Sequence, residues 1–265
     1  MFTLLNIVQP DTIDEAYKTL MDKRNNAILG GCAFLRLGSS KIGTGIELSK
    51  LNLNYITEVQ DSIEIGAMAT FRDIETNAML QQYFSGMLPK AVSNVIGVQF
   101  RNVVTVGASV YAKYGFSDLI TALLALDTEV ELYKAGRMSL AEFLARPIEK
   151  DFLTKIVIKK NQRQGSYHSL RGSASDFPIL NAAVSNLHGQ WIIAVGAMPS
   201  RAKIAHKASA QLTRGNRNAA EIAGMAAEEL EFGTNARATA EYRKAICKVL
   251  ITRGIEEVLQ CKSKL

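Results

Sequence analysis

The stretch that decides the fold is QFRNVVTVGASVYAKYGFSDLITALLALD, which runs from Gln99 to Asp127. Within it, the β-branched run Val103–Val106 leads directly into the small residues Gly107–Ser109. A loop follows, and then the apolar run Leu119–Leu126, which is typical of a helix. We therefore expect a short strand, a turn of small residues, a loop and a helix. Because small residues let a backbone approach closely, such a turn can offer its N–H groups to a phosphate.

A second turn of small residues lies upstream. The apolar run Ala27–Leu29 ends in Gly30–Ala33, and Phe34 follows. A lone pair of glycines is most simply a tight exit from a strand, but two such turns, each after an apolar run, favour a phosphate cradle. Neither turn matches G-x-G-x-x-G or the P-loop pattern, so the sequence supports no Rossmann or Walker site.

Asp118, at the start of the expected helix, has two interpretations. It is either the N-cap of that helix, with Ser117 as a rival cap, or a carboxylate that faces a ribose hydroxyl of a nucleotide. The local sequence favours the cap, because an Asp or Ser at a helix start is common. Both interpretations stay open on these residues alone.

Length and composition exclude several classes of protein. Of the 265 residues, 48% are hydrophobic and 21% charged, which allows one large domain or two smaller ones. The net charge is +6, but no basic run is interleaved with aromatic residues, so we expect no nucleic-acid binding. The N-terminus lacks the pattern of a signal peptide, and no apolar stretch is long enough to span a membrane. We expect a cytoplasmic protein.

The cysteines and histidines predict no metal site. Cys32, Cys247 and Cys261 are far apart and form no C-x-x-C pair, which disfavours a disulfide framework and a zinc or iron–sulfur site. No histidine lies in H-x-x-x-H or beside a cysteine. His188 precedes a glycine and is expected to be solvated in a turn, whereas His168 lies in a predicted strand and is kept as a site candidate. With no G-x-S-x-G elbow, we predict no catalytic side chain, and a bound organic cofactor would remove the need for one.

The remaining elements indicate two parts. Up to residue 160, short strands mix with helices, and alternation predicts a hairpin over residues 56–67. The polar, turn-rich segment Lys159–Gly165 marks a boundary. After it we expect three segments that form an antiparallel sheet (166–170; 177–184, a strand or a helix; 191–195) and two helices (219–231 and 240–259).

Motifs in order along the chain resemble those of the FAD-binding subunit of the molybdenum hydroxylases, the medium-chain flavoproteins of xanthine dehydrogenase and carbon monoxide dehydrogenase. ILGGCAFL, from Ile28 to Leu35, is similar to the first flavin loop of the family, AGGTDLL. IGAMAT, from Ile65 to Thr70, matches I-G-A-x-x-T, and the stretch from Gln99 to Ser109 resembles Q-I-R-N-x-A-T-I-G-G-N. Asp118–Asp127 matches D-L-L-P-A-L-L-A-L-D. Residues 171–177 and 241–243 fall where the family has R-x-A-x-D-F and E-Y-R.

The resemblance implies an α+β fold with two domains. A FAD-binding domain would cover residues 1–160, as two small α/β subdomains at about 1–55 and 56–160. A C-terminal flavoprotein domain with an antiparallel sheet and helices would cover residues 161–265.

The resemblance also implies which residues bind FAD. The two turns would face the pyrophosphate with backbone N–H groups, Asp118 would hold part of the ADP moiety, and His168 would lie near the flavin. For Asp118 this favours the second interpretation. The implied cofactor-binding residues are Ala27, Ile28, Leu29, Gly30, Gly31, Cys32, Ala33, Phe34, Val95, Thr105, Val106, Gly107, Ala108, Ser109, Asp118, Leu153 and His168.

The implied function is electron transfer in a complex. Such a subunit receives electrons from a 2Fe–2S small subunit, which is fed by a molybdopterin-binding large subunit, and its FAD reduces an acceptor such as NAD. Two alternatives remain open. A docking subunit without FAD is motivated by Cys32–Ala33 and Ala108–Ser109, which replace Thr-Asp and Gly-Asn of the family. A stand-alone flavin reductase would need a proton-donating Ser or Glu late in the chain, in a context that the sequence lacks.

Overall fold

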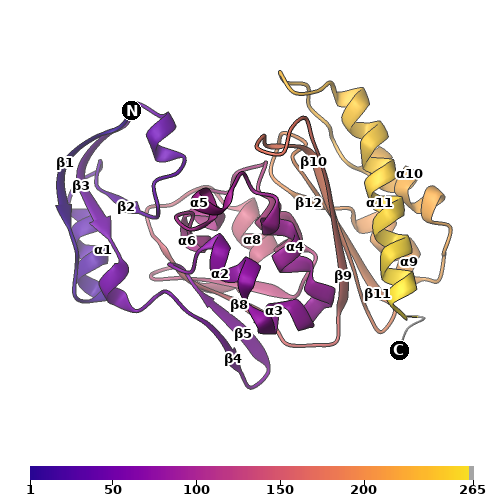
Figure 1. The fold of residues 1–265 in the computed structure, drawn as a ribbon, viewed down its shortest axis with the longest axis horizontal. Helices are drawn as coiled ribbons and strands as arrows, with labels where there is room; N and C mark the ends of the chain where they lie inside the picture. Colours follow the sequence, from indigo (N-terminus) through magenta and orange to yellow (C-terminus); the bar gives the residue numbers. More distant parts are fainter. Residues whose placement is uncertain (263–265) are drawn as a thin grey trace. The chain divides into compact units, whose positions relative to one another are not determined.

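The computed structural model describes residues 1–262, and the chain divides into two compact units (Figure 1). Unit 1 comprises Met1–Ile74, Val98–Ala112 and Thr128–Ile158, and unit 2 comprises Glu75–Gly97, Lys113–Asp127 and the chain from Lys159 onward. Each unit combines helices with strands, which confirms the predicted α+β class. Among residues 1–262, no helix has both the length and the apolar character that crossing a membrane requires.

A small parallel sheet forms the first part of unit 1. Its strand order is β1 (Thr3–Val8), β3 (Lys41–Glu47) and β2 (Ala27–Leu29), and helix α1 (Ile13–Asp22) connects the first strand to β2. Ala16 and Leu20 of α1 are buried in one apolar cluster with Ile46 of β3. The short 3-10 helices η1 (Leu35–Leu37) and η2 (Ser49–Leu51) follow β2 and β3.

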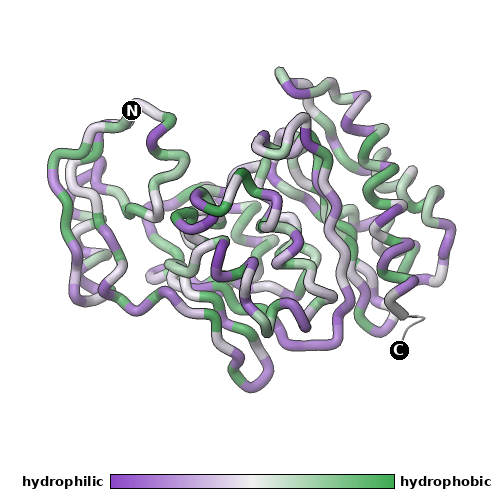
Figure 2. The backbone as a smooth tube through the Cα atoms, viewed as in Figure 1, coloured by the Kyte–Doolittle hydropathy of each residue, from purple (hydrophilic) through white to green (hydrophobic). Residues whose placement is uncertain are grey.

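A five-stranded sheet forms the rest of unit 1. Its order is β4 (Ile56–Val59), β5 (Ser62–Gly66), β8 (Leu153–Lys159), β6 (Thr128–Leu132) and β7 (Gly136–Ser139). The predicted hairpin over 56–67 is confirmed as the antiparallel pair β4–β5, with a hydrophilic turn (Figure 2). Between β5 and β8 in the sequence, the helices that begin in unit 1 are α2 (Phe71–Thr76), α5 (Val98–Arg101), α6 (Val106–Tyr111) and α8 (Leu140–Ala145).

The strand predicted at Val103–Val106 is wrong. Thr105 is the N-cap of α6, and its hydroxyl oxygen accepts a hydrogen bond from the Ala108 N–H at 3.3 Å. Val106 and Val110 are buried one helical turn apart on the inner face of α6. Packing of this face therefore outweighs the strand preference of the β-branched run.

An antiparallel sheet forms the centre of unit 2, as predicted. Its order is β12 (Lys203–Ile204), β11 (Gln190–Gly196), β10 (Pro178–Leu187) and β9 (Gln164–Arg171). The ambiguous segment 177–184 is therefore a strand. Side chains are buried at almost every position of β10, because two helices contact it. These helices are α7 (Asp118–Leu124) and α11 (Ala240–Lys262). A strand covered on both faces loses the alternation that identifies a strand.

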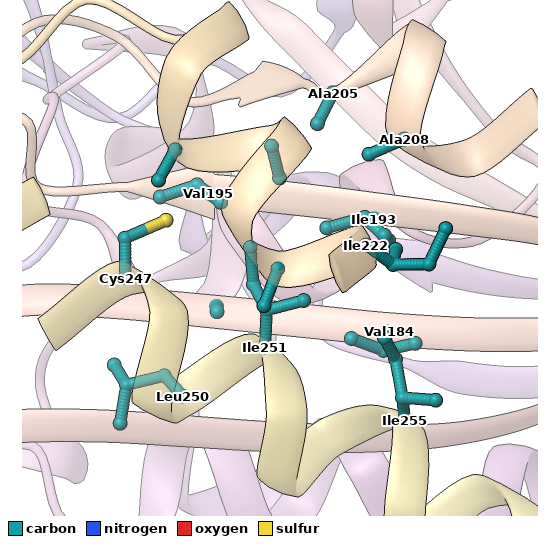
Figure 3. Close-up of a cluster of buried hydrophobic side chains, with 14 of the residues drawn as sticks. Val184, Ile193, Val195, Ala205, Ala208, Ile222, Cys247, Leu250, Ile251 and Ile255 are labelled. Atoms are coloured by element: carbon teal, nitrogen blue, oxygen red, sulfur yellow. The ribbon is translucent and has the colours of Figure 1, made fainter. Parts of the chain in front are cut away.

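Helices α9 (His206–Thr213), α10 (Ala219–Glu229) and α11 contribute to the apolar core of unit 2 (Figure 3). Val184 and Ile193 from the sheet meet Ile222, Ile251 and Ile255 from these helices. The two helices predicted at 219–231 and 240–259 are confirmed as α10 and α11. Unit 2 also contains α3 (Ala78–Gln82), the 3-10 segment η3 (Tyr83–Gly86) and α4 (Met87–Ser93).

Candidate functional site

The two turns of small residues meet in unit 1. Gly30, directly after β2, lies against the start of α6, so that a Cβ on Gly30 would be 2.6 Å from the Ala108 Cβ and 2.8 Å from the Thr105 hydroxyl oxygen. Gly107 lies equally close to Ala67, whose carbonyl accepts the Gly107 N–H at 2.8 Å. Two segments about 75 residues apart in the chain thus approach each other because neither carries a large side chain there.

A cavity of about 440 Å³ opens beside these turns. Seven of the predicted site residues line it: Ala27, Ile28, Gly30, Thr105, Gly107, Ala108 and Leu153. Its volume is within the range of small-molecule sites, which is about 300–1,000 Å³. The remaining predicted residues of unit 1 do not line it, and three of them, Leu29, Val106 and Ser109, are buried.

The first turn has N–H groups that a ligand can bind. Gly31 and Cys32 have positive φ angles of 71° and 54°, and the N–H groups of Gly31, Cys32 and Ala33 donate to no backbone carbonyl within residues 1–262. Consecutive N–H groups in a turn that lack acceptors within the protein can bind an anion. Burial raises the pKa of the Cys32 thiol, so this side chain adds no negative charge to the turn.

The second turn contributes in a different way from the one expected. The N–H groups of Val106 and Gly107 donate to Ala69 and Ala67. Those of Ala108 and Ser109 donate to the side chain and the carbonyl of Thr105. These four amides are therefore engaged within the protein, and the second turn presents the Thr105 hydroxyl and a close backbone instead. The helical conformation that consumes these amides is the same feature that contradicts the predicted strand.

Several cavity residues were not predicted. Arg24 follows α1, and Ile148, Glu149 and Lys150 form a loop before β8. They reach the cavity only through the tertiary fold, and no motif marks them. They add an apolar side chain, two cations and the Glu149 carboxylate to the wall.

Tyr111, at the end of α6, fastens this loop to the cavity wall. Its hydroxyl donates to the Glu149 carbonyl and accepts from the Asp151 N–H at 3.0 Å. The Asp151 carboxylate in turn accepts the backbone N–H groups of Lys134, Ala135 and Phe152. Burial raises the pKa of Tyr111, so the hydroxyl stays neutral and keeps both bonds.

In unit 2, Asp118 is not the N-cap. Ser117 is the cap of α7, since its hydroxyl oxygen accepts the Ile120 N–H at 3.2 Å. The Asp118 carboxylate is buried and accepts a hydrogen bond from the Tyr167 hydroxyl, and the Arg171 guanidinium lies 2.6 Å from it. Asp118 thus joins α7 to β9, a role that its local sequence does not reveal.

Tyr167 should make the protein sensitive to alkali. Its pKa is raised well above 10.0, first by burial and then by the Asp118 charge, so the folded protein keeps a proton that the unfolded chain releases above pH 10. The stabilising contribution of neutral Tyr167 is complete below that pH and is lost as the pH rises. The free energy of unfolding should therefore fall by up to about 1.4 kcal/mol more per pH unit in wild type than in Tyr167→Phe.

Urea denaturation of both proteins between pH 9 and pH 11 measures this difference. The other tyrosines are common to both proteins and cancel in the comparison. Parallel pH profiles would show that Tyr167 ionises in the folded state as it does in the unfolded chain.

The other predicted residues of unit 2, Val95 and His168, lie on different elements of the fold from Asp118. His168 is on β9, where its Nε2 atom lies 2.8 Å from a carboxylate oxygen of Glu257, and the Lys90 ammonium is 2.9 Å from the other oxygen. Burial lowers the pKa of His168, and the Glu257 charge opposes that shift. Val95 is half-buried in the loop after α4. The roles of these residues in cofactor binding stay predictions.

Comparison with known proteins identifies the family. The model of the FAD binding domain in molybdopterin dehydrogenase matches residues 2–160, and that of the CO dehydrogenase flavoprotein C-terminal domain matches residues 165–258. The chain is 24% identical over 250 residues to the uncharacterized protein YgfM of Escherichia coli K12, with 92% of each chain covered. It is 23% identical over 273 residues to the glyceraldehyde dehydrogenase medium chain of Sulfolobus acidocaldarius, covering 95% of this chain and 97% of the relative.

The fold is also that of a solved structure. A chain of quinoline 2-oxidoreductase from Pseudomonas putida 86 superimposes with a TM-score of 0.85 at 21% identity, over 98% of this chain and 97% of that one. The predicted resemblance is thereby confirmed. This chain belongs to the family of FAD-binding oxidoreductase subunits that includes the molybdopterin dehydrogenase and CO dehydrogenase flavoproteins.

Proposed function

We propose that this chain binds FAD at the cavity of unit 1 and serves as the electron-transfer subunit of a molybdenum hydroxylase complex. The observation that carries the proposal is the turn Gly31–Ala33, whose N–H groups donate to no backbone carbonyl of the described residues and which directly follows Gly30 in the cavity wall. At Gly30 the lack of a side chain lets the backbone pack closely against Thr105 and Ala108. Bound FAD would supply the redox chemistry by accepting and releasing electrons.

The residues that line the cavity fit a dinucleotide. The amides of Gly31–Ala33, which directly follow the cavity-lining Gly30 in the chain, and the Thr105 hydroxyl suit phosphate oxygens. Arg24 and Lys150 supply positive charge to a wall that also contains Glu149 and Asp151. Apolar residues such as Ile28 and Leu153 suit the flat face of a base. Tyr111 holds the loop that completes this wall.

The names of relatives support the proposed assembly. A relative is the medium chain of a glyceraldehyde dehydrogenase, which indicates one chain among several. By analogy, this chain would take electrons from a 2Fe–2S small subunit, which a molybdopterin-binding large subunit supplies. Its flavin would pass them to an acceptor such as NAD.

The visible absorption spectrum of the purified chain tests the cofactor. We expect a flavin spectrum, and extraction should release FAD in a ratio of about one per chain, a single pocket having one ligand. A colourless chain that takes up no added FAD would favour a docking subunit. Flavin-dependent turnover of a substrate without any partner chain would favour a stand-alone reductase.

Arg24 should strengthen cofactor binding through its charge. In Arg24→Met, the dissociation constant for FAD should rise about threefold, because an exposed cation contributes about 0.5–1 kcal/mol to an ionic contact. Fluorescence titration of the apoprotein at low salt measures the constant. Lys18→Met, which removes an exposed cation outside the cavity lining, is the control. Equal affinities of the two variants would place Arg24 outside the phosphate site.

A further inference from the structure

Strand β1 is an open edge of the parallel sheet in unit 1. It pairs with β3 on one side, and no strand within residues 1–262 pairs with its other side (Figure 1). The Thr3 N–H donates to the Ser40 carbonyl at 2.9 Å, so every second residue from Thr3 directs its N–H and C=O groups toward β3. The N–H and C=O groups of Leu4, Asn6 and Val8 therefore point to the open edge.

Two large apolar side chains of β1 are exposed. Leu5 is 78% exposed and Ile7 is 56% exposed. Because side chains alternate along a strand, both lie on the face opposite to that of Val8, which packs against the apolar cluster that contains Ala16 of α1. An open strand that combines unpaired backbone groups with exposed apolar side chains is a template for the addition of another strand.

Features that usually prevent strand addition are missing from β1. Its sequence, TLLNIV, contains no charged residue and no proline, and its pairing with β3 shows no shift of register. By contrast, the outer strands β4 and β7 of the five-stranded sheet carry Glu58 and Arg137. The edge at β1 is therefore suited to a covering strand, whereas those at β4 and β7 are protected by charge.

We propose that β1 pairs with β1 of a second copy of this chain, antiparallel and about a two-fold axis at Asn6. In this register Leu4 lies opposite the second copy's Val8, and Asn6 lies opposite its own counterpart. These are the residues whose N–H and C=O groups point outward, so each pair exchanges both of its hydrogen bonds. The strand is thus complementary to itself, as a two-fold interface requires.

The same register brings the exposed apolar side chains together. Leu5 lies opposite the second copy's Ile7 in a pair without backbone hydrogen bonds, where side chains approach most closely. No like charges meet, because β1 is uncharged. The two three-stranded sheets become one continuous sheet. This contact does not rest on the proposed function, since no residue of β1 lines the cavity of unit 1.

Sedimentation of the purified full chain over a dilution series tests the proposal. The expected species has twice the 29.0 kDa mass of one chain. In Leu5→Asp the dissociation constant of the dimer should rise at least about tenfold, because a carboxylate would be buried against the second copy's Ile7. Ile7→Lys should have the same effect. The double variant should dimerise again, because each new carboxylate then lies opposite a new ammonium group.

Leu37→Asp is the matched control, because Leu37 lies on η1 and is 70% exposed. It should dimerise as wild type does. Circular dichroism checks that each variant is folded. Hydrogen exchange on wild type gives a second test that needs no variant, since the N–H groups of Leu4, Asn6 and Val8 should exchange more slowly as the concentration rises.

Four outcomes would overturn the proposal. They are a wild-type monomer at every concentration, a folded Leu5→Asp variant that dimerises as wild type does, a folded double variant that stays monomeric, and β1 amides that are protected only after different partner chains are added. The last outcome would assign the edge to another subunit of a complex.

Discussion

Gly31→Ala should abolish FAD retention and lower the free energy of unfolding by about 3 kcal/mol. Two effects add. Alanine at a φ of 71° costs about 1 kcal/mol. In addition, a Cβ on Gly31 would overlap the carbonyl oxygen of Val103, and the backbone shift that relieves such an overlap costs about 1–3 kcal/mol. The shift moves both the free amides of the first turn and the segment that leads to Thr105.

Gly136→Ala is the matched control for Gly31→Ala. Gly136 has nearly the same φ, 72°, but nothing lies within 4 Å of the position of its Cβ. It should lose about 1 kcal/mol of stability and keep its flavin. Urea denaturation and the visible spectrum report the two properties separately. If Gly31→Ala matched Gly136→Ala in both, the close approach of Gly31 to Val103 would have no role in cofactor binding.

Arg243→Met should lower the free energy of unfolding by about 4 kcal/mol. Arg243 lies on α11, and its side chain is among the largest that are completely buried. Its guanidinium donates to the carbonyls of Ile179 and Ala197 and to the side chain of Asn235. Each acceptor left without a donor in the interior costs about 1–3 kcal/mol.

Arg253→Met is the control, because Arg253 lies on the same helix and is exposed. Its stability should differ from that of wild type by less than about 0.5 kcal/mol. Thermal or urea denaturation of both variants measures the contrast. A small effect for Arg243→Met would mean that water replaces the guanidinium as the donor to these oxygens.

The sequence patterns correctly predicted those elements in which the local residue preferences agree with the tertiary packing. The β4–β5 hairpin was predictable because β5 alternates between half-buried residues and the buried Ile63 and Ile65, and α10 and α11 are long enough to carry a helical pattern. The errors lie where tertiary packing decides. Thr105 looks like a strand residue until Ala108 donates to it, and β10 lacks alternation because both faces are covered.

The candidate site was predictable to a similar degree. The two turns could be predicted because runs of glycine and alanine mark places where the backbone packs closely against another segment, as Gly30 does against Ala108. The partners of Asp118 were not visible, since Tyr167 lies 49 residues away and the sequence gives no pairing signal between them. Arg24, Tyr111 and the loop at 148–150 likewise acquire a role only when the fold places them around one cavity.

The interleaving of the two units has a consequence for how the chain is made. The backbone passes from one unit to the other at five points, after residues 74, 97, 112, 127 and 158. A nascent chain that has reached residue 160 carries α4 and α7, but the strands β10 and β11 that α7 contacts are not yet synthesised. Leu119, Ile120 and Leu123 would then be solvated. Expression of a fragment cut at that point should therefore yield a protein that aggregates or recruits chaperones, and useful truncations must leave all five crossings intact.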